Sequence, residues 1–117
     1  MKDNPLLEKT FAFAIRVVET YRHLVENERE YVLSKQFLRS GTSVGANAEE
    51  AVGAQSRADF ISKLSIAYKE ARETMYWIRL LRATNYLDGA TATSLLSDCD
   101  ELLRIIGKIQ ITTKRNS

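Results

Sequence analysis

The 117-residue sequence has few of the residues that cross-link or interrupt a chain. It contains one cysteine, one proline, one histidine and five glycines. A single cysteine cannot form an intramolecular disulfide or a cysteine-based metal cluster, so the sequence predicts a reducing, cytoplasmic setting. Because 44% of the residues are hydrophobic, the composition favours a helical globular fold over disorder. At this length we expect one domain, covering 1–117.

Two further absences limit the classes of function. Neither sign of charge is in large excess, because 17 basic and 15 acidic residues leave a net charge of +2. We therefore do not expect a protein whose whole surface binds nucleic acid, although a local basic patch is compatible with this balance. No segment has the apolar length of a signal peptide or a membrane span, so no membrane partner is expected.

Apolar residues recur with the period of an α-helix in four segments, and the alternation typical of a β-strand never persists. The predicted helices cover about 5–26, 28–54, 57–86 and 91–111. Asn4 and Ser56 are suitable N-cap residues for the first and third helices. Asn27 and Glu30 have the spacing of a capping box at the start of the second. Since the connecting loops are short, the sequence predicts an all-α, up-down-up-down antiparallel four-helix bundle.

The stretch RSGTSVGANAEEA, residues 39–51, places two glycines four residues apart. A Walker-type phosphate loop needs G-x-x-x-x-G-K-[ST] after a β-strand, and the sequence has neither this spacing nor a preceding strand pattern. On a helix, Gly41 and Gly45 share one face, and Ser40 and Ser43 lie on neighbouring ridges. Each central glycine costs about 0.5–1 kcal/mol relative to alanine. We therefore expect close helix packing, either within the bundle or with a second subunit.

Residues 39–51 and the segment FISKLSIAYKEARETMYWIRLL at 60–81 resemble a known bacterial family. It is a family of four-helix bundles first noticed as reading frames in intervening sequences of 23S ribosomal RNA genes. The residues that match its pattern are Gln36, Arg39, Ser40, Ser43, Asn47, Lys69, Glu70, Ala71, Glu73, Thr74, Tyr76, Trp77, Leu80 and Leu81. The mild departures are Phe37, Val44, Ala48 and Ile78.

This resemblance implies a homo-oligomer, typically a pentamer, without an established enzymatic activity. It also implies kinship of fold with the accessory variability determinant of diversity-generating retroelements, which binds nucleic acid and a reverse transcriptase. The resemblance therefore indicates architecture far more specifically than function.

Polar residues of the second and third predicted helices are expected to meet. If the two helices pair about a turn near 55–56, Arg39 lies at the level of residue 72, between Glu70 and Glu73. We expect Arg39 to pair with one of these carboxylates, because a planar guanidinium suits bidentate pairing.

The carboxylates invite a comparison with dimetal bundles, which use inward carboxylates and Glu-x-x-His motifs. Besides Glu70 and Glu73, the sequence offers Glu49 and Glu50, but it contains no Glu-x-x-His. The only histidine, His23, is expected at the surface or its boundary. No metal and no other cofactor are therefore expected.

Two other polar or reactive residues have mainly structural interpretations. Cys99 lies on an apolar stripe and is expected in the core, without a base partner that would make it a nucleophile. Asn47 is expected to form a structural hydrogen bond, with an exposed ligand contact as the alternative. With no catalytic set visible, an enzyme is not expected.

Basic and aromatic residues recur at helical spacing on the third helix, at Lys69, Arg72, Tyr76, Arg79 and Tyr86, with Arg82 beside them. Basic groups neutralise phosphates and tyrosines stack on unpaired bases, a combination that suits single-stranded RNA. An oligomer contact is the alternative, since protein interfaces also favour Arg and Tyr.

Two classes of function stay open. The first is an oligomeric binding or adaptor protein that presents basic surface to RNA or to a nucleic-acid-processing partner. The second is a purely structural or protein-interaction module. For self-association, we expect an exposed apolar surface formed by Phe37, Leu38, Tyr76 and Trp77.

Overall fold

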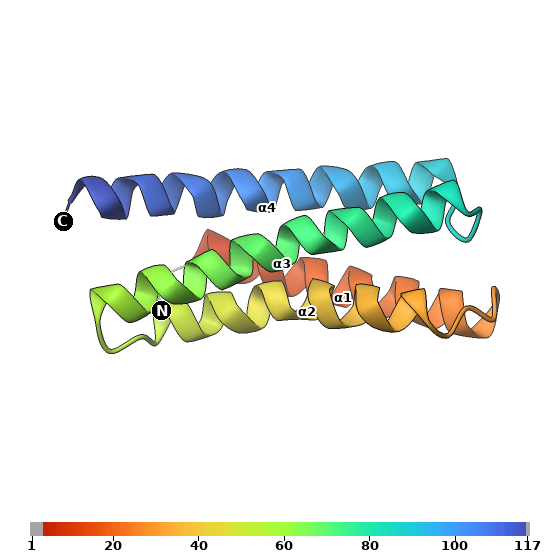
Figure 1. Ribbon diagram of the computed structural model, residues 1–117, viewed down its shortest axis with the longest axis horizontal. Helices are drawn as coiled ribbons and strands as arrows, with labels where there is room; N and C mark the ends of the chain where they lie inside the picture. Colours follow the sequence, from red (N-terminus) through yellow and green to blue (C-terminus); the bar gives the residue numbers. More distant parts are fainter. Residues whose placement is uncertain (1–3, 117) are drawn as a thin grey trace.

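The computed structural model describes residues 4–116 and consists of four α-helices joined by short loops (Figure 1). The helices are α1 (Pro5–Glu26), α2 (Leu33–Val52), α3 (Arg57–Ala83) and α4 (Gly89–Arg115). Each helix packs on the next, and α4 also contacts α1, which gives an up-down-up-down antiparallel bundle. The described residues contain no strand, so the predicted fold class is confirmed. Residues 1–3 and 117 of the predicted domain lie outside the described range.

Local side-chain caps define three of the helix starts. Asn4 Oδ1 accepts a hydrogen bond from Leu7 N at 3.2 Å, and Ser56 Oγ accepts one from Asp59 N at 3.1 Å, as the sequence predicts. Asp88 caps α4, accepting from Thr91 N at 2.6 Å. These side chains satisfy N–H groups that have no partner within the helix.

Four other helix ends differ from the prediction. The second helix ends at Val52 instead of 54, with Gly53 as its C-cap. The third helix ends at Ala83 instead of 86, because the chain turns there and Asn85 has a positive φ of 69°. The fourth begins at Gly89, immediately after its Asp88 cap, instead of 91. It also continues past 111 to Arg115.

The predicted start of the second helix is also wrong. Asn27 is the C-cap of α1, and Arg29 adopts a left-handed φ of 54° in the loop that follows. Glu30 is only 8% exposed and turns its carboxylate toward the start of α2. This carboxylate accepts from three backbone N–H groups, those of Val32 at 3.1 Å, Leu33 at 3.0 Å and Ser34 at 2.6 Å.

The hydrogen bonds at Glu30 determine its ionisation. Burial alone raises the pKa of the Glu30 carboxyl, but the bonds from Ser34, Leu33 and Val32 outweigh it and leave the pKa below its ordinary value. Glu30 is therefore an anionic cap, which suits the positive end of the helix dipole. The capping-box spacing indicated a helix start near the right place but assigned the acidic residue to the helix interior.

The two central glycines lie inside α2 and face α1. A Cβ on Gly41 would lie 2.7 Å from Cγ2 of Val17, and one on Gly45 would lie 3.4 Å from the backbone oxygen of Thr10. Any larger residue at 41 would overlap α1. The helix-packing interpretation is confirmed, and the partner is a helix of the same bundle.

None of the four helices, within residues 4–116, has a hydrocarbon-rich stretch sufficient to cross a membrane.

Candidate nucleic-acid interface

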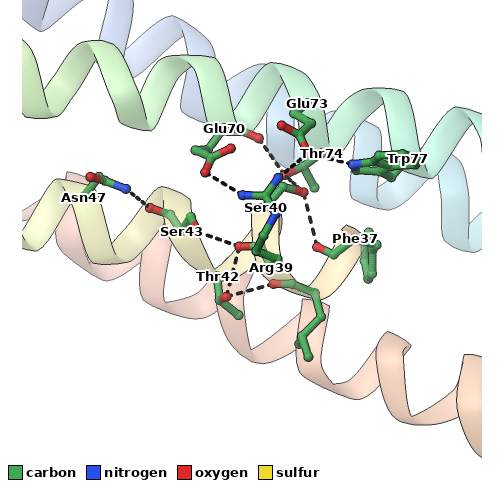
Figure 2. A network of polar contacts seen from close by, with 11 residues as sticks. Phe37, Arg39, Ser40, Thr42, Ser43, Asn47, Glu70, Glu73, Thr74 and Trp77 are labelled. Atoms are coloured by element: carbon green, nitrogen blue, oxygen red, sulfur yellow. Dashed lines mark hydrogen bonds and ion pairs between the residues drawn. The ribbon is translucent and has the colours of Figure 1, made fainter. Parts of the chain in front are cut away.

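A network of polar side chains connects α2 to α3 near the middle of the bundle (Figure 2). Arg39 of α2 donates from Nη1 to Glu70 Oε2 at 2.9 Å and from Nη2 to Glu73 Oε2. The sequence predicted a pair with one of these carboxylates, and the structure shows that Arg39 binds both. The Glu70 side chain is only 12% exposed, so Arg39 is the neutralising partner of a nearly buried charge.

A buried pair of hydroxyl groups extends this network into the interior. Thr74 Oγ1 lies 2.9 Å from Ser40 Oγ and donates to the Glu70 carbonyl oxygen at 2.7 Å. Both hydroxyl-bearing residues are fully buried. In the described part of the chain, every buried side-chain nitrogen or oxygen has a hydrogen-bond partner.

Three further polar residues of the stretch 39–51 form hydrogen bonds or ion pairs. Ser43 Oγ donates to the carbonyl oxygen of Arg39 at 2.6 Å, and Asn47 Nδ2 donates to that of Ser43 at 2.9 Å. The predicted structural hydrogen bond of Asn47 is therefore confirmed, within its own helix. Glu50 is exposed and pairs with Lys63 at 2.8 Å.

The same network supports an aromatic pair on α3. Trp77 Nε1 donates to Glu73 Oε2 at 3.0 Å. Tyr76 packs edge-to-face on Trp77, with ring centroids 5.1 Å apart and an interplanar angle of 73°. The hydrogen bond from Trp77 and the guanidinium of Arg39 hold the pKa of Glu73 below its ordinary value, against the opposing effect of burial. Glu73 therefore stays ionised as the acceptor of both donors.

A long open groove of about 870 Å³ lies between α3 and α4. Its α3 wall consists of Tyr68, Arg72, Met75, Tyr76 and Arg79. Its α4 wall consists of Asp100, Leu103, Arg104, Gly107, Lys108, Ile111, Thr112 and Arg115. We call this the α3–α4 groove.

The charged side chains that line the groove are mostly basic. Five of its lining side chains are basic and one, Asp100, is acidic. That carboxylate pairs with Arg104 at 3.2 Å, so the other basic groups face no acidic lining residue. Two tyrosines, Tyr68 and Tyr76, stand among them. A chain with a net charge of only +2 thus concentrates positive charge at one place.

The structure brings together half of the predicted basic and aromatic face. Arg72, Tyr76 and Arg79 line the α3–α4 groove. Arg82 lines a smaller hollow of about 300 Å³ at the end of α3, together with Tyr76 and Arg79. Lys69 is exposed but is not a lining residue of the groove, and it contributes to lowering the pKa of Glu73.

The prediction that Tyr86 shares this face is wrong. The helix ends at Ala83, and Tyr86 lies in the turn that follows, half-buried against the core. Because the helix has ended, Tyr86 no longer lies on the helix face that the residue spacing predicted for it.

The α4 wall of the groove was not predicted. Arg104, Lys108 and Arg115 recur at intervals of four and seven residues, which places them on one face of a helix. This spacing was readable in the sequence. The sequence did not show that this surface faces Arg72 and Arg79, because its direction depends on the rotation of α4 about its axis.

The predicted apolar surface for self-association is largely wrong. Phe37 is fully buried, and Leu38 and Trp77 are half-buried against the core, whereas Tyr76 is exposed. Phe37 belongs to the inward stripe of α2, one turn before Gly41.

A different apolar surface is exposed on α1. Phe11 is 65% exposed and Ile15, one turn later, is 46% exposed. A hollow of about 340 Å³ lies beside Phe11, with the lining residues Thr10, Phe11, Ala14, Thr42, Gly45, Ala46 and Glu49. We call this the α1–α2 apolar face.

The remaining reactive residues have structural places. His23 is exposed and lies 3.7 Å from Glu28, as expected of a surface residue. Cys99 is in the core, where burial above all, with the nearby charge of Asp98, raises the pKa of its thiol to about 12. Among residues 4–116, no three His, Cys, Asp or Glu side chains are grouped to hold a metal ion.

Comparisons with known proteins agree with this architecture. The family described as 23S rRNA-intervening sequence protein matches residues 2–108. A crystal structure of a protein of unknown function from the S23 ribosomal protein family of Bacteroides thetaiotaomicron VPI-5482 is 48% identical to this chain, with a TM-score of 0.89. That alignment covers 90% of this chain and 97% of the other. No curated protein matches. The match over most of the length, together with the shared four-helix fold, shows that the chain belongs to the 23S rRNA-intervening sequence protein family.

Proposed function

We propose that this protein is a non-enzymatic, cytoplasmic binding protein that takes single-stranded RNA into the α3–α4 groove. The observation that carries the proposal is the clustering of five basic side chains and two tyrosines around one open groove with a single, paired carboxylate. Basic side chains neutralise phosphates, and exposed tyrosine rings stack on unpaired bases without regard to sequence. The same combination is poorly suited to a duplex, whose bases are already stacked.

The arrangement of the groove supports a strand running along it. Arg72 and Arg79 lie two turns apart on α3, and Lys108 and Arg115 lie two turns apart on the facing helix. Tyr76 lies between the two arginines and is 52% exposed. A ribose–phosphate chain in the groove would therefore meet positive charge on both sides and an aromatic ring between them.

Fluorescence anisotropy with a labelled single-stranded RNA, from about 50 to 200 mM salt, tests this proposal. The logarithm of the association constant is expected to fall with the logarithm of salt by about 0.7 per phosphate contact. Lys108→Gln should weaken binding and reduce that slope by about 0.7. Lys35→Gln is the matched control, because Lys35 is an exposed lysine of α2 outside the groove.

Absence of binding at the lowest salt would reject the proposal, as would equal losses in Lys108→Gln and Lys35→Gln. A fully paired RNA hairpin should bind more weakly than the single strand, since its bases are not available to Tyr76.

The exposed α1–α2 apolar face favours self-association as a second property. Phe11 protrudes beside a hollow lined mostly by small residues of the same face, so a second copy offers both the side chain and the space that this face needs. We propose a homo-oligomer in which Phe11 of one copy enters the hollow of the next, a head-to-tail contact of the kind that can close into a ring. The family resemblance suggests five subunits. Repetition of the groove in a ring would raise the avidity for a long RNA.

Light scattering tests the assembly. The unmodified chain should elute as a multiple of 13.3 kDa at micromolar concentration, and Phe11→Ser should shift it toward the monomer. Ile111→Ser is the control for assembly, because Ile111 is also an exposed apolar residue but lines the α3–α4 groove instead of this face. A stable oligomer that binds no RNA would favour the alternative function, a structural or protein-interaction module. A monomer at every concentration measured would reject self-association.

A further inference from the structure

The ring of Tyr76 contacts that of its neighbour in sequence, Trp77. Adjacent residues of an α-helix point about 100° apart, so their side chains do not ordinarily face each other. Here the rings of Tyr76 and Trp77 meet edge-to-face at 5.1 Å. The two side chains therefore lean toward each other along the helix surface, and Trp77 is half-buried against the core.

A chain of polar contacts fixes the indole (Figure 2). Trp77 Nε1 donates to Glu73 Oε2 at 3.0 Å, and the same oxygen accepts from Arg39. The other terminal nitrogen of Arg39 donates to Glu70 at 2.9 Å. The guanidinium thus binds the nearly buried carboxylate of Glu70 and orients the half-buried carboxylate of Glu73, which accepts the hydrogen bond of the tryptophan.

We propose that Arg39 and Glu73 are positioning residues that hold Trp77, and through it Tyr76, in the orientation that stacks on an unpaired RNA base. The proposal depends on the proposed function of the α3–α4 groove. The ion pair of Arg39 with Glu70 is sufficient to link α2 to α3. The second ion pair, with Glu73, connects Arg39 to the aromatic pair at the groove. A ring ordered before binding loses less conformational freedom when a base stacks on it.

The first arm of the test needs no RNA. Trp77 is the only tryptophan, so intrinsic fluorescence reports on its indole alone. Arg39→Met should increase the quenching of Trp77 by acrylamide and weaken its near-ultraviolet circular dichroism. Arg16→Met is the matched control: Arg16 is 37% exposed and forms an ion pair with Asp98 on the opposite seam between α1 and α4. It should leave both signals unchanged.

The second arm measures RNA affinity as a double-mutant cycle. Loss of a stacking contact, as in Tyr76→Leu, should weaken binding by at least about fivefold. Arg39→Met should weaken it by about three- to tenfold, because part of the stacking contribution is lost. In the Tyr76→Leu background, Arg39→Met should have less than about a twofold effect. The salt slope should not change in Arg39→Met, since Arg39 is not a lining residue of the groove.

The outcomes separate the two proposals. Unchanged quenching of Trp77 in Arg39→Met would overturn the positioning role, whatever happens with RNA. Equal losses for Arg39→Met with and without Tyr76 would overturn it as well. No RNA binding by the unmodified protein would reject the groove function and with it the stacking role, and the quenching comparison would then show whether the network orders the rings at all.

Discussion

Gly41 of α2 lies directly against the isopropyl group of Val17 of α1, where one further methyl group would overlap it. Gly41→Ala is therefore expected to destabilise the protein by about 1–3 kcal/mol, despite the better helix propensity of alanine. Val17 is fully buried and β-branched, so it has little freedom to move aside. Chemical denaturation monitored by circular dichroism measures the change.

Gly45→Ala is the control for that prediction. Its added Cβ would lie 3.4 Å from the Thr10 carbonyl oxygen, close to ordinary contact. We expect a change within about 1 kcal/mol, because gained propensity offsets mild crowding. In the double variant Gly41→Ala/Val17→Ala, the loss should be smaller than the sum of the single losses. Equal effects at 41 and 45 would contradict the close approach of α1 at Gly41.

Glu30→Gln should remove the anionic cap of α2. Near neutral pH the variant is expected to be less stable by about 1–2 kcal/mol. Because the pKa of Glu30 is lowered in the folded state, its stabilisation is present above the unfolded value of about 4.3 and is lost as pH falls through the folded value. The difference between parent and variant should therefore shrink below about pH 4. A difference in unfolding free energy that is independent of pH would contradict the ionic role.

The Cys99 thiol should be unreactive in the folded protein. Burial raises its pKa to about 12, so almost no thiolate forms at mildly alkaline pH. A thiol reagent such as Ellman's reagent should modify the protein only after denaturant unfolds it. Rapid labelling of the native chain near pH 8 would show that α4 opens readily.

Arg39→Met should lower the melting temperature through its effect on Glu70. Removal of Arg39 leaves a carboxylate whose side chain is 12% exposed without its ion-pair partner. Arg39 itself is 48% exposed, so solvent screening reduces the loss to about 1 kcal/mol, or roughly 3–6 °C for a chain of this size. A melting temperature within about 1 °C of the parent would show that the pair has no structural weight.

The helical architecture could be predicted because apolar periodicity is a property of each segment alone. The same holds for the caps at Asn4 and Ser56, whose partners lie three residues away. The prediction of where α2 starts was wrong because it used residue spacing alone. Asn27 and Glu30 have the spacing of a capping box, but the left-handed φ of Arg29 turns the chain before the helix begins. A spacing rule does not reveal such a turn.

The candidate site was only half visible in the sequence. The pairing of Arg39 with α3 followed from antiparallel register, and the structure confirms it. The burial of Phe37 was readable, because Phe37, Gly41, Val44 and Ala48 follow a single helical stripe. The α3–α4 groove could not be predicted. Arg72 and Lys108 line its two walls only because α3 and α4 are rotated about their axes in a particular way, and the sequence does not show that rotation.

The buried hydroxyls of Ser40 and Thr74 have a consequence for the alignment of α2 and α3. They meet at 2.9 Å in the buried part of a seam whose outer part carries the ion pairs of Arg39 with Glu70 and Glu73. If one helix slid along the other by a single turn, about 5.4 Å, each hydroxyl would lose the other as its neighbour and face hydrocarbon. The pair therefore acts with the ion pairs of Arg39 to fix how far one helix can slide along the other.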